Sequence, residues 1–504
     1  MIAKQKKLLI VFAGIFILLL VAYLAFIRPA VNAPDEETVT DPLETTPGEY
    51  MTPGGQLFMY PQIPRASMQS VSVTNEHGTY KFYRDADGNF QIRGFEGTPY
   101  DSTLFSSLVT SAGYTITKTK VVDNATEAEL AEYGLDNPQA TWTVTSVTGA
   151  SYTVQVGYDL LTGGGYYCMV EGRRSVYVLG NEIAQTMFAP IETLCSPVFI
   201  AGISQNDYYT IDNIVLLAYG EELCRITRLD PALHKNPQAL VEYKMDYPEG
   251  YTPNDGLVTE MLYTFTSVTG TSVVKIGPTA EDAAACGLTN PAFTVGFTYM
   301  NVPVLLFFSE LQENGTYNVQ STLFPHMIVA VDAATLPFIK TDLLSWVKKT
   351  VFNDWLVTLA EIETVGSGAD VLFTLTHGVA ENGNATLDVV SDTGKVIPNA
   401  EVNNFRQFYK TMLTMEIKDT VPLSDEEIAA LAVEENCILT VRLKTVAGVE
   451  NVYRFYPYSS TGRRALLTVN GNGEFYVETD LVKKIASDAN KVLNDLDVDA
   501  YAKD

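Results

Sequence analysis

The chain has 504 residues, of which 46% are apolar and 18% are charged. That much apolar material can bury several cores, which excludes a largely disordered chain, and the length corresponds to about three domains. The formal net charge is −27, so the protein repels the phosphates of nucleic acids and is not expected to bind them.

The first feature along the chain is an uncharged apolar run from Leu8 to Ile27. At about 1.5 Å per residue in a helix, this run matches the thickness of a bilayer's hydrocarbon core, about 30 Å. Lysines precede it and acidic residues follow, so the positive-inside rule predicts a cytoplasmic tail at 1–7 and an extracytoplasmic body. The sequence thus predicts a single-pass cell-membrane protein that contacts the lipid bilayer through this helix. A cleaved signal peptide is the alternative, but its apolar region is usually shorter, about 7–15 residues.

Residues 28–64 are rich in proline and acidic residues, which predicts an extended linker. From residue 65 onward, apolar and polar residues alternate between turns that contain glycine, asparagine and aspartate, a pattern typical of antiparallel strands. Helices are expected near 102–111, from about 124 to 134 and at 181–188. Four strands are expected between 140 and 179.

The chain also repeats itself. The segment 128–149 recurs at 281–302, and a divergent third copy is expected at 425–448. The first two copies share a Gly-Leu-x-Asn-Pro turn. Its residues are Gly134, Leu135, Asn137 and Pro138 in one copy and Gly287, Leu288, Asn290 and Pro291 in the other.

This turn has a physical interpretation at each position. Glycine is expected to end a helix in the left-handed conformation, and leucine to pack back against that helix. Asparagine bonds its local backbone, and proline sets the entry into the next strand. We therefore interpret the turn as a structural motif rather than a ligand site.

The predicted fold class is α+β. An N-terminal transmembrane helix is followed by about three repeated modules of antiparallel β-sheet with packed helices. The expected module boundaries are 65–200, 201–350 and 351–504.

Two tryptophans, Trp346 and Trp355, lie at the junction of the second and third expected modules. Apolar residues around them recur at helical spacing, which predicts packing within or between modules. The alternative is a groove for a partner protein, which makes these two residues the candidate partner surface.

The sequence contains no pattern that indicates a catalytic, cofactor-binding or metal site. The four histidines form no HExxH pair. A Gly-x-Ser-x-Gly elbow, a phosphate-binding loop and a dinucleotide fingerprint are all missing. The five cysteines form no CxxC pair and are odd in number, so we expect small buried apolar residues rather than a disulfide framework. We expect no enzyme activity, no cofactor and no bound metal.

One segment resembles a known family. "YGLDNPQATWTV", followed by "YTVQVG", a Gly-rich turn, "YYCMVEG" and "VYVL", is similar to the bacterial domain of unknown function numbered 4340. The resemblance covers 128–195 well and 281–335 moderately. Members typically carry one N-terminal membrane helix, and some are found with auxiliary components of gliding-type ABC transport systems. The resemblance therefore implies an envelope protein as partner, with ABC transporter subunits as candidates.

We predict a membrane-anchored extracytoplasmic accessory or scaffold protein that acts by docking to a protein rather than by catalysis. Two alternatives stay open. A stand-alone binding module for a glycan, peptide or cation would be protected against unfolding by its ligand. A cell-surface hydrolase would lose turnover when a single carboxylate is substituted.

Overall fold

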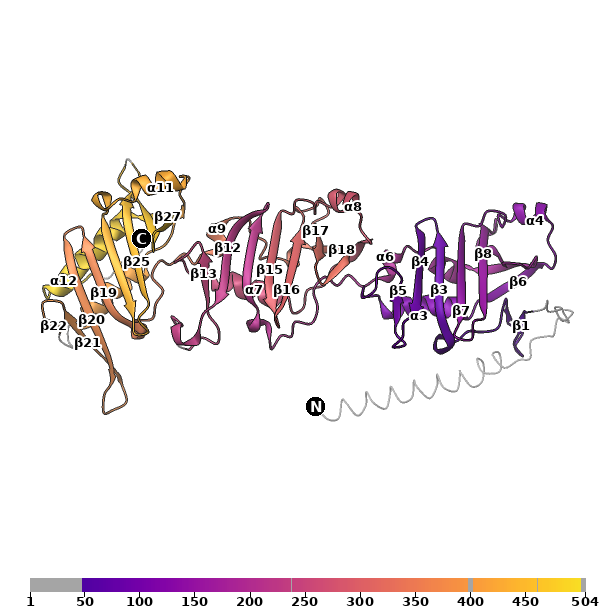
Figure 1. The fold of residues 1–504 in the computed structure, drawn as a ribbon, viewed down its shortest axis with the longest axis horizontal. Coiled ribbons are helices and arrows are strands. Elements are labelled where there is room, and N and C mark those ends of the chain that lie inside the picture. The colour runs from indigo at the N-terminus through magenta and orange to yellow at the C-terminus, as the bar shows by residue number, and fades with distance from the viewer. Residues whose placement is uncertain (1–47, 237, 398–401, 460, 500–504) are drawn as a thin grey trace, which may run out of the picture. The chain divides into compact units, whose positions relative to one another are not determined.

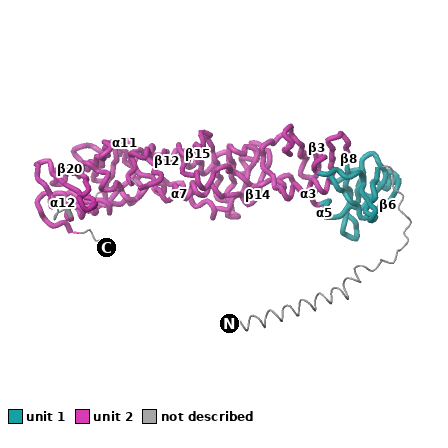
Figure 2. The backbone as a smooth tube through the Cα atoms, turned by 90° about the horizontal axis from the view of Figure 1, so that it is seen from below, with its two compact units in different colours: residues 1–64, 113–139, 152–184 teal, residues 65–112, 140–151, 185–504 magenta. Residues whose placement is uncertain are grey.

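The structure is a computed structural model that describes residues 48–236, 238–397, 402–459 and 461–499. The chain divides into two compact units, which Figure 2 distinguishes by colour. The first unit consists of the described residues up to Pro64 together with 113–139 and 152–184. The second consists of 65–112, 140–151 and the described residues from Gln185 onward. The boundaries of the three expected modules stay a prediction.

The first unit is a set of antiparallel strands with one short helix. Helix α4 (Glu127–Glu132) buries its Leu130 in a cluster with Ala125, Leu135 and Val176. In order across the sheet, the strands are β1 (Tyr50–Met51), β2 (Leu57–Phe58), β6 (Ile116–Val122), β10 (Val176–Gly180), β9 (Gly165–Val170) and β8 (Ser151–Asp159).

The C-terminal end of the expected linker is part of this sheet. Leu57 and Phe58 are buried in β2, which pairs with β6. The proline-rich composition of 28–64 predicted an extended segment. Its last apolar residues instead add a strand, because burial of these side chains is favourable.

The second unit begins with four strands, β7 (Ala140–Ser146), β3 (Met68–Asn75), β4 (Gly78–Arg84) and β5 (Phe90–Ile92), in that order. Helix α3 (Ser102–Gly113) places Phe105 against Phe82 and Phe90, with ring centroids 4.8 Å and 5.0 Å away. Helices α5 (Asn181–Phe188) and α6 (Ile191–Leu194) follow. The helices expected near 102–111 and at 181–188 are confirmed.

An eight-stranded antiparallel sheet comes next along the chain (Figure 1). Helices α7 (Asp255–Thr264), α8 (Ala280–Ala285) and α9 (Leu343–Trp346) accompany it. Its strands, in order across the sheet, are β13 (Tyr243–Tyr247), β12 (Glu221–Arg228), β11 (Asp212–Ala218), β15 (Phe293–Tyr299), β16 (Val302–Phe308), β17 (Thr316–Ser321), β18 (Phe324–Asp332) and β14 (Ser272–Ile276).

A nine-stranded sheet completes the second unit. Helix α12 (Thr479–Leu493) contacts strands across this sheet and packs against α10 (Val402–Leu413). The buried residues of α12 recur at helical spacing and include Leu481, Val482, Ile485, Ala489 and Val492. The strands, in order, are β22 (Val396–Ile397), β21 (Ala385–Ser391), β20 (Ala369–Val379), β19 (Leu359–Gly366), β24 (Leu439–Thr445), β25 (Glu450–Pro457), β26 (Arg464–Val469), β27 (Asn472–Glu478) and β23 (Asp419–Thr420).

The same strand order recurs along the chain. In the eight-stranded sheet, the first strand of one meander pairs with the first strand of the next, as β11 pairs with β15. The nine-stranded sheet repeats this order with β19 and β24 and adds β22 at one edge. The orders β5-β4-β3-β7 in the second unit and β8-β9-β10-β6 in the first correspond to the two halves of the same arrangement.

A short helix with a capping box precedes the longer meander in each case. The cap pairs are Thr126 with Glu129 in α4, Thr279 with Asp282 in α8, and Ser424 with Glu427 in α11 (Asp425–Leu431). In each pair the two side chains bond each other's backbone N–H groups, which would otherwise lack a helical partner.

The Gly-Leu-x-Asn-Pro turns end the first two of these helices. Gly134 and Gly287 have φ values of 68° and 73°. The N–H of Leu135 donates to the carbonyl of Leu130 at 2.8 Å, and that of Leu288 donates to Ala283 at 2.8 Å. This is the Schellman arrangement, in which a left-handed residue lets the chain satisfy the last helical carbonyls.

The membrane part of the predicted fold class and of the predicted localisation needs correction. No helix in the described ranges is long and apolar enough to cross a bilayer. The apolar run from Leu8 to Ile27 lies outside the described residues. In the described part of the chain, strands predominate over short helices, so we describe the fold as mainly antiparallel β-sheet.

The segment after β13 packs on the nine-stranded sheet within the second unit. The Tyr251 ring meets the Phe475 ring edge-on at 5.0 Å, and its hydroxyl donates to the carbonyl of Asn472 at 3.0 Å. Glu474 lies beside it, and one oxygen of its buried carboxyl has no hydrogen-bond partner among the described residues. Burial raises the pKa of the Glu474 carboxyl above its ordinary value.

We expect the substitution Gly157→Ala to destabilise the first unit. A Cβ atom at this position would lie 2.1 Å from the carbonyl oxygen of Tyr133, which accepts the Tyr158 N–H at 2.8 Å. Moving these atoms apart should cost about 2 kcal/mol or more. Faster hydrogen exchange in α4 and β8 measures this cost. Gly54→Ala, where a Cβ would meet only Thr52 Oγ1 at an unstrained 3.9 Å, is the matched control, and equal exchange in the two variants would show that the contact is unimportant.

We expect Glu474→Gln to raise the melting temperature at pH 7. The folded protein keeps the Glu474 proton at pH values where the unfolded chain has lost it, because its folded-state pKa is raised above 4.5. Stability is therefore lost as pH rises from 4.5 through the raised pKa, and the substitution should remove this loss. Thermal unfolding across pH tests it, with the exposed Glu426→Gln as control. Parallel melting curves for wild type and Glu474→Gln would contradict the prediction.

Candidate functional site

A cavity of about 1040 Å³ lies within the second unit. Several parts of the chain line it: the end of β12, its connection to β13 and β13 itself; residues between 249 and 259; residues between 348 and 358; the turn between β24 and β25; and Asn470. Because these parts are distant in sequence, only the folded chain brings them together.

The connection between β12 and β13 is held in shape by its own carboxylates. Asp230 accepts the N–H of Ala232 at 2.8 Å and caps the short 3-10 helix Pro231–Leu233. The Glu242 carboxylate accepts the N–H groups of Lys235 at 2.6 Å and Asn236 at 2.7 Å. These bonds fix the backbone from which the Lys235 side chain enters the cavity wall.

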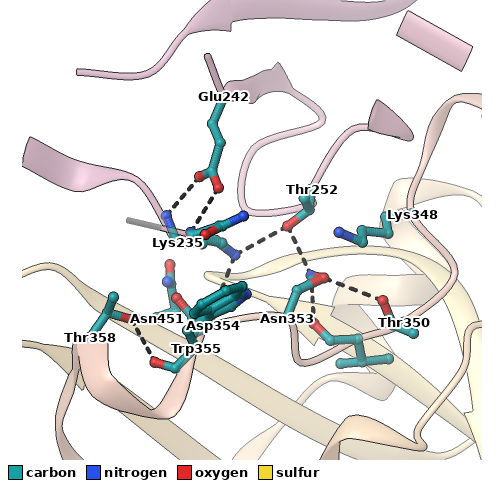
Figure 3. A network of polar contacts seen from close by, with 12 residues as sticks. Lys235, Glu242, Thr252, Lys348, Thr350, Asn353, Asp354, Trp355, Thr358 and Asn451 are labelled. Atoms are coloured by element: carbon teal, nitrogen blue, oxygen red, sulfur yellow. Dashed lines mark hydrogen bonds and ion pairs between the residues drawn. The ribbon is translucent and has the colours of Figure 1, made fainter. Parts of the chain in front are cut away.

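Lys235 makes the central ion pair of the site (Figure 3). Its Nζ lies 3.6 Å from Oδ2 of Asp354, whose side chain is only 2% exposed. The same Nζ donates to Oγ1 of Thr252 at 3.1 Å. Oδ2 of Asp354 accepts no hydrogen bond from a described residue. This buried carboxylate therefore depends on the Lys235 ammonium for its counter-charge.

Asn353 extends the network on the other side of Thr252. Its Nδ2 donates to Thr252 Oγ1 at 3.0 Å, and Thr350 Oγ1 donates to its Oδ1 at 3.3 Å. The N–H of Trp355 donates to the carbonyl of Lys235 at 3.3 Å. As Figure 3 shows, these bonds join the segment 350–355 to Thr252, which follows β13, and to the β12–β13 connection.

Two tyrosines lie behind Asp354. The Tyr409 hydroxyl donates to the backbone carbonyl of Asp354. Burial, followed by the nearby Asp354 carboxylate, raises the pKa of the Tyr409 and Tyr453 hydroxyls above their usual range. Both hydroxyls therefore stay protonated at neutral pH and act as donors or packing groups rather than as bases.

Several exposed apolar side chains also line the cavity. Trp355 is 45% exposed although it belongs to the wall. Leu233, Val357 and Val446 are also exposed and line the same cavity. The site therefore combines a fixed polar wall with exposed apolar side chains around it, an arrangement suited to binding.

The two tryptophans that the sequence made candidates for a partner surface have different environments. Trp346 is fully buried, its Nε1 donates to the carbonyl of Lys340 at 2.9 Å, and its ring stacks with Phe293. It packs within the eight-stranded sheet region and is not accessible to a partner. Trp355 is accessible and lines the cavity.

The residues of the two Gly-Leu-x-Asn-Pro turns, which we interpreted as a structural motif, lie away from the cavity. Gly134, Leu135, Asn137 and Pro138 belong to the first unit, and Gly287, Leu288, Asn290 and Pro291 follow α8. None of them lines the cavity. Sequence reasoning missed Lys235, Thr252 and Asp354, since a single lysine, threonine and aspartate at wide spacing form no recognisable motif.

Within the described ranges, no group of three His, Cys, Asp or Glu side chains is arranged to hold a metal ion. Burial raises the pKa of the Cys195 thiol to about 12, so this thiol is not a nucleophile at neutral pH. The site offers hydrogen-bond acceptors, three lysine ammonium groups that are paired with aspartates, and apolar surface.

We expect Lys235→Met to destabilise the second unit by about 2–3 kcal/mol, because it leaves the Asp354 carboxylate buried without a counter-charge. Adding Asp354→Asn should recover part of this loss. Urea unfolding followed by tryptophan fluorescence measures both effects.

Lys348→Met is the matched control for this prediction. Its partner Asp255 is half-exposed, so the loss should be at most about 0.5–1 kcal/mol. Equal losses for Lys235→Met and Lys348→Met would show that the buried ion pair has no special importance.

The comparisons with known proteins give one match. No curated protein and no solved structure matches the chain. The model of one family matches residues 96–291, a range that includes the first Gly-Leu-x-Asn-Pro turn and ends on Pro291 of the second. The resemblance expected from the sequence is thereby confirmed over residues 96–291, which match the family described as Domain of unknown function (DUF4340).

Proposed function

We propose that this chain is an accessory protein that binds a protein partner in the cavity of the second unit and has no catalytic activity. The observation that carries the proposal is the exposed apolar surface of a cavity of about 1040 Å³. Exposed apolar side chains that gather around a concavity are characteristic of sites that bind partners.

Trp355 is the expected anchor of this interaction. Its ring is half-exposed, while its backbone N–H is bonded to Lys235 and its carbonyl accepts both the N–H and the hydroxyl of Thr358 at 2.8 Å. A large side chain on a fixed backbone loses little conformational freedom on binding. Tryptophan is for this reason over-represented among the residues that dominate interface energies.

The polar wall supports recognition rather than chemistry. The Lys235 ammonium already contacts Asp354 and Thr252, and Glu242 is occupied by two backbone N–H groups. These groups are bonded to one another, so the wall is preorganised before any partner arrives. A partner would gain hydrogen bonds to a surface that need not rearrange.

Subunits of an ABC-type transport system are our candidate partners. This choice depends on the resemblance to a family some of whose members are found with auxiliary components of such systems. The cavity itself supports only the mode of binding, by apolar anchoring beside polar groups.

We expect the double variant Trp355→Ala, Val446→Asp to lose partner binding. Tagged wild-type and variant chains would be purified from the native host, and co-purifying permease and ATPase subunits would be quantified by mass spectrometry. A drop of about 10-fold or more corresponds to the loss of an interface hot spot, about 1.4 kcal/mol or more. Val379→Asp is the matched control, because Val379 is exposed and does not line the cavity.

The outcomes separate the possible functions. Equal recovery of the subunits with both variants overturns docking at the cavity. If the purified chain is instead stabilised by a glycan, and Trp355→Ala abolishes that stabilisation, the cavity is a small-ligand site. The exposed Trp355 ring beside Asn353 and Asn451, which also line the cavity, is the observation that favours this second candidate.

A further inference from the structure

The edge strand of the eight-stranded sheet runs along the cavity. Strand β13 is the last strand on its side of the sheet and pairs with β12. Four consecutive residues of β13, from Tyr243 to Asp246, line the cavity. Consecutive side chains of a strand point to opposite faces, so a cavity that touches all four must lie along the edge of the strand.

The pairing register identifies the backbone groups on this edge. The N–H of Leu229 donates to the carbonyl of Glu242 at 2.8 Å, which makes these two residues a hydrogen-bonded pair. Such pairs alternate along an antiparallel ladder. Tyr243 opposite Arg228, and Met245 opposite Ile226, are therefore non-hydrogen-bonded pairs whose N–H and C=O groups point away from β12.

These outward N–H and C=O groups have no backbone hydrogen-bond partner among the described residues. No backbone hydrogen bond joins Tyr243 or Met245 to a described residue outside the pairing with β12. The opposite edge of the sheet differs, since Ile276 in β14 donates its N–H to the Glu192 carboxylate at 3.3 Å. An open edge is a template on which an additional strand can pair.

The charges along the wall indicate the composition of that strand. Four acidic residues on the wall form no ion pair with a described residue: Asp230, Glu242, Glu249 and Glu450. Among the wall's Lys and Arg residues, Arg228 likewise forms no ion pair with a described residue. The unbalanced charge is therefore negative and favours basic side chains. The wall's lysines are already neutralised, in the pairs Lys235–Asp354, Lys244–Asp246 and Lys348–Asp255.

We propose that the cavity binds an extended polypeptide segment of the partner, which adds to the sheet as a new strand beside β13. This inference depends on the proposed docking function and specifies its mode. The segment hydrogen-bonds to the backbone of Tyr243 and Met245, places apolar side chains against Trp355 and Val446, and directs basic side chains toward the carboxylates that form no ion pair.

A blocked hexapeptide of alternating lysine and valine is the probe. Hydrogen exchange of the full chain with residue resolution is measured at about 1 mM peptide, where even an affinity in the millimolar range is detected. We expect exchange at the Tyr243 and Met245 amides to slow at least about 2-fold, the half-occupancy limit. The Lys244 amide, which faces β12, is the internal control and should not change.

Analogues of the peptide test the backbone bonds directly. One analogue is N-methylated on the first set of alternate amides and the other on the second set. Only one set faces β13, so one analogue should lose at least about 10-fold in affinity, equal to about 1.4 kcal/mol, while the other keeps it. Trp355→Ala should weaken the parent peptide as well.

Two results would overturn the proposal. One is unchanged exchange at Tyr243 and Met245 with the peptide present. The other is equal affinity of the two methylated analogues. If the Trp355 and Val446 variants still lose the transporter subunits, docking at the cavity stands and only strand addition fails. If those variants retain the subunits, the proposed function itself fails.

Discussion

One pairing in each repeated arrangement of the second unit joins two groups of strands that are distant in the chain: β3 with β7, β11 with β15, and β19 with β24. Each of these ladders sets buried apolar residues opposite one another, such as Leu216 with Val295 and Ile362 with Leu443. Closing the intervening chain costs conformational entropy. Burial of these facing side chains offsets that cost, and the neighbouring hairpins then extend the sheet on either side.

The position of the cavity follows from this pairing. Once β11 pairs with β15, strand β12 lies beside β11 and β13 takes the edge. The connection that leads into β13, together with the segment 249–252, then meets the nine-stranded sheet region through contacts such as Tyr251 with Phe475. An edge strand and a polar wall are brought together by the same packing that buries the cores.

The polar network limits how this cavity can act. Glu242, Lys235, Thr252 and Asn353 are bonded to one another across three parts of the chain. Among the side-chain atoms of this network in the described residues, Asp354 Oδ2 is the buried one that has no hydrogen bond. A wall of this kind favours recognition by complementary shape and hydrogen bonding, since its groups are already oriented.

Local signals in the sequence determined much of the local structure. The S/T-x-x-D/E patterns at Thr126, Thr279 and Ser424 start helices with capping boxes, and Gly134 and Gly287 end two of them in the left-handed conformation. These features depend on residues within one or two turns of chain, so their physical causes are visible in the sequence. The alternating apolar pattern likewise predicted strands, because its period of two sets one face toward a core.

The tertiary structure alone decided the rest. The proline-rich composition did not reveal that Leu57 and Phe58 form a strand, because their burial depends on β6 far along the chain. The sequence made Trp346 and Trp355 equal candidates, yet packing against Phe293 buries the first and leaves the second on the cavity. Lys235, Thr252 and Asp354 became a site only through long-range strand pairing, which no local pattern of residues encodes.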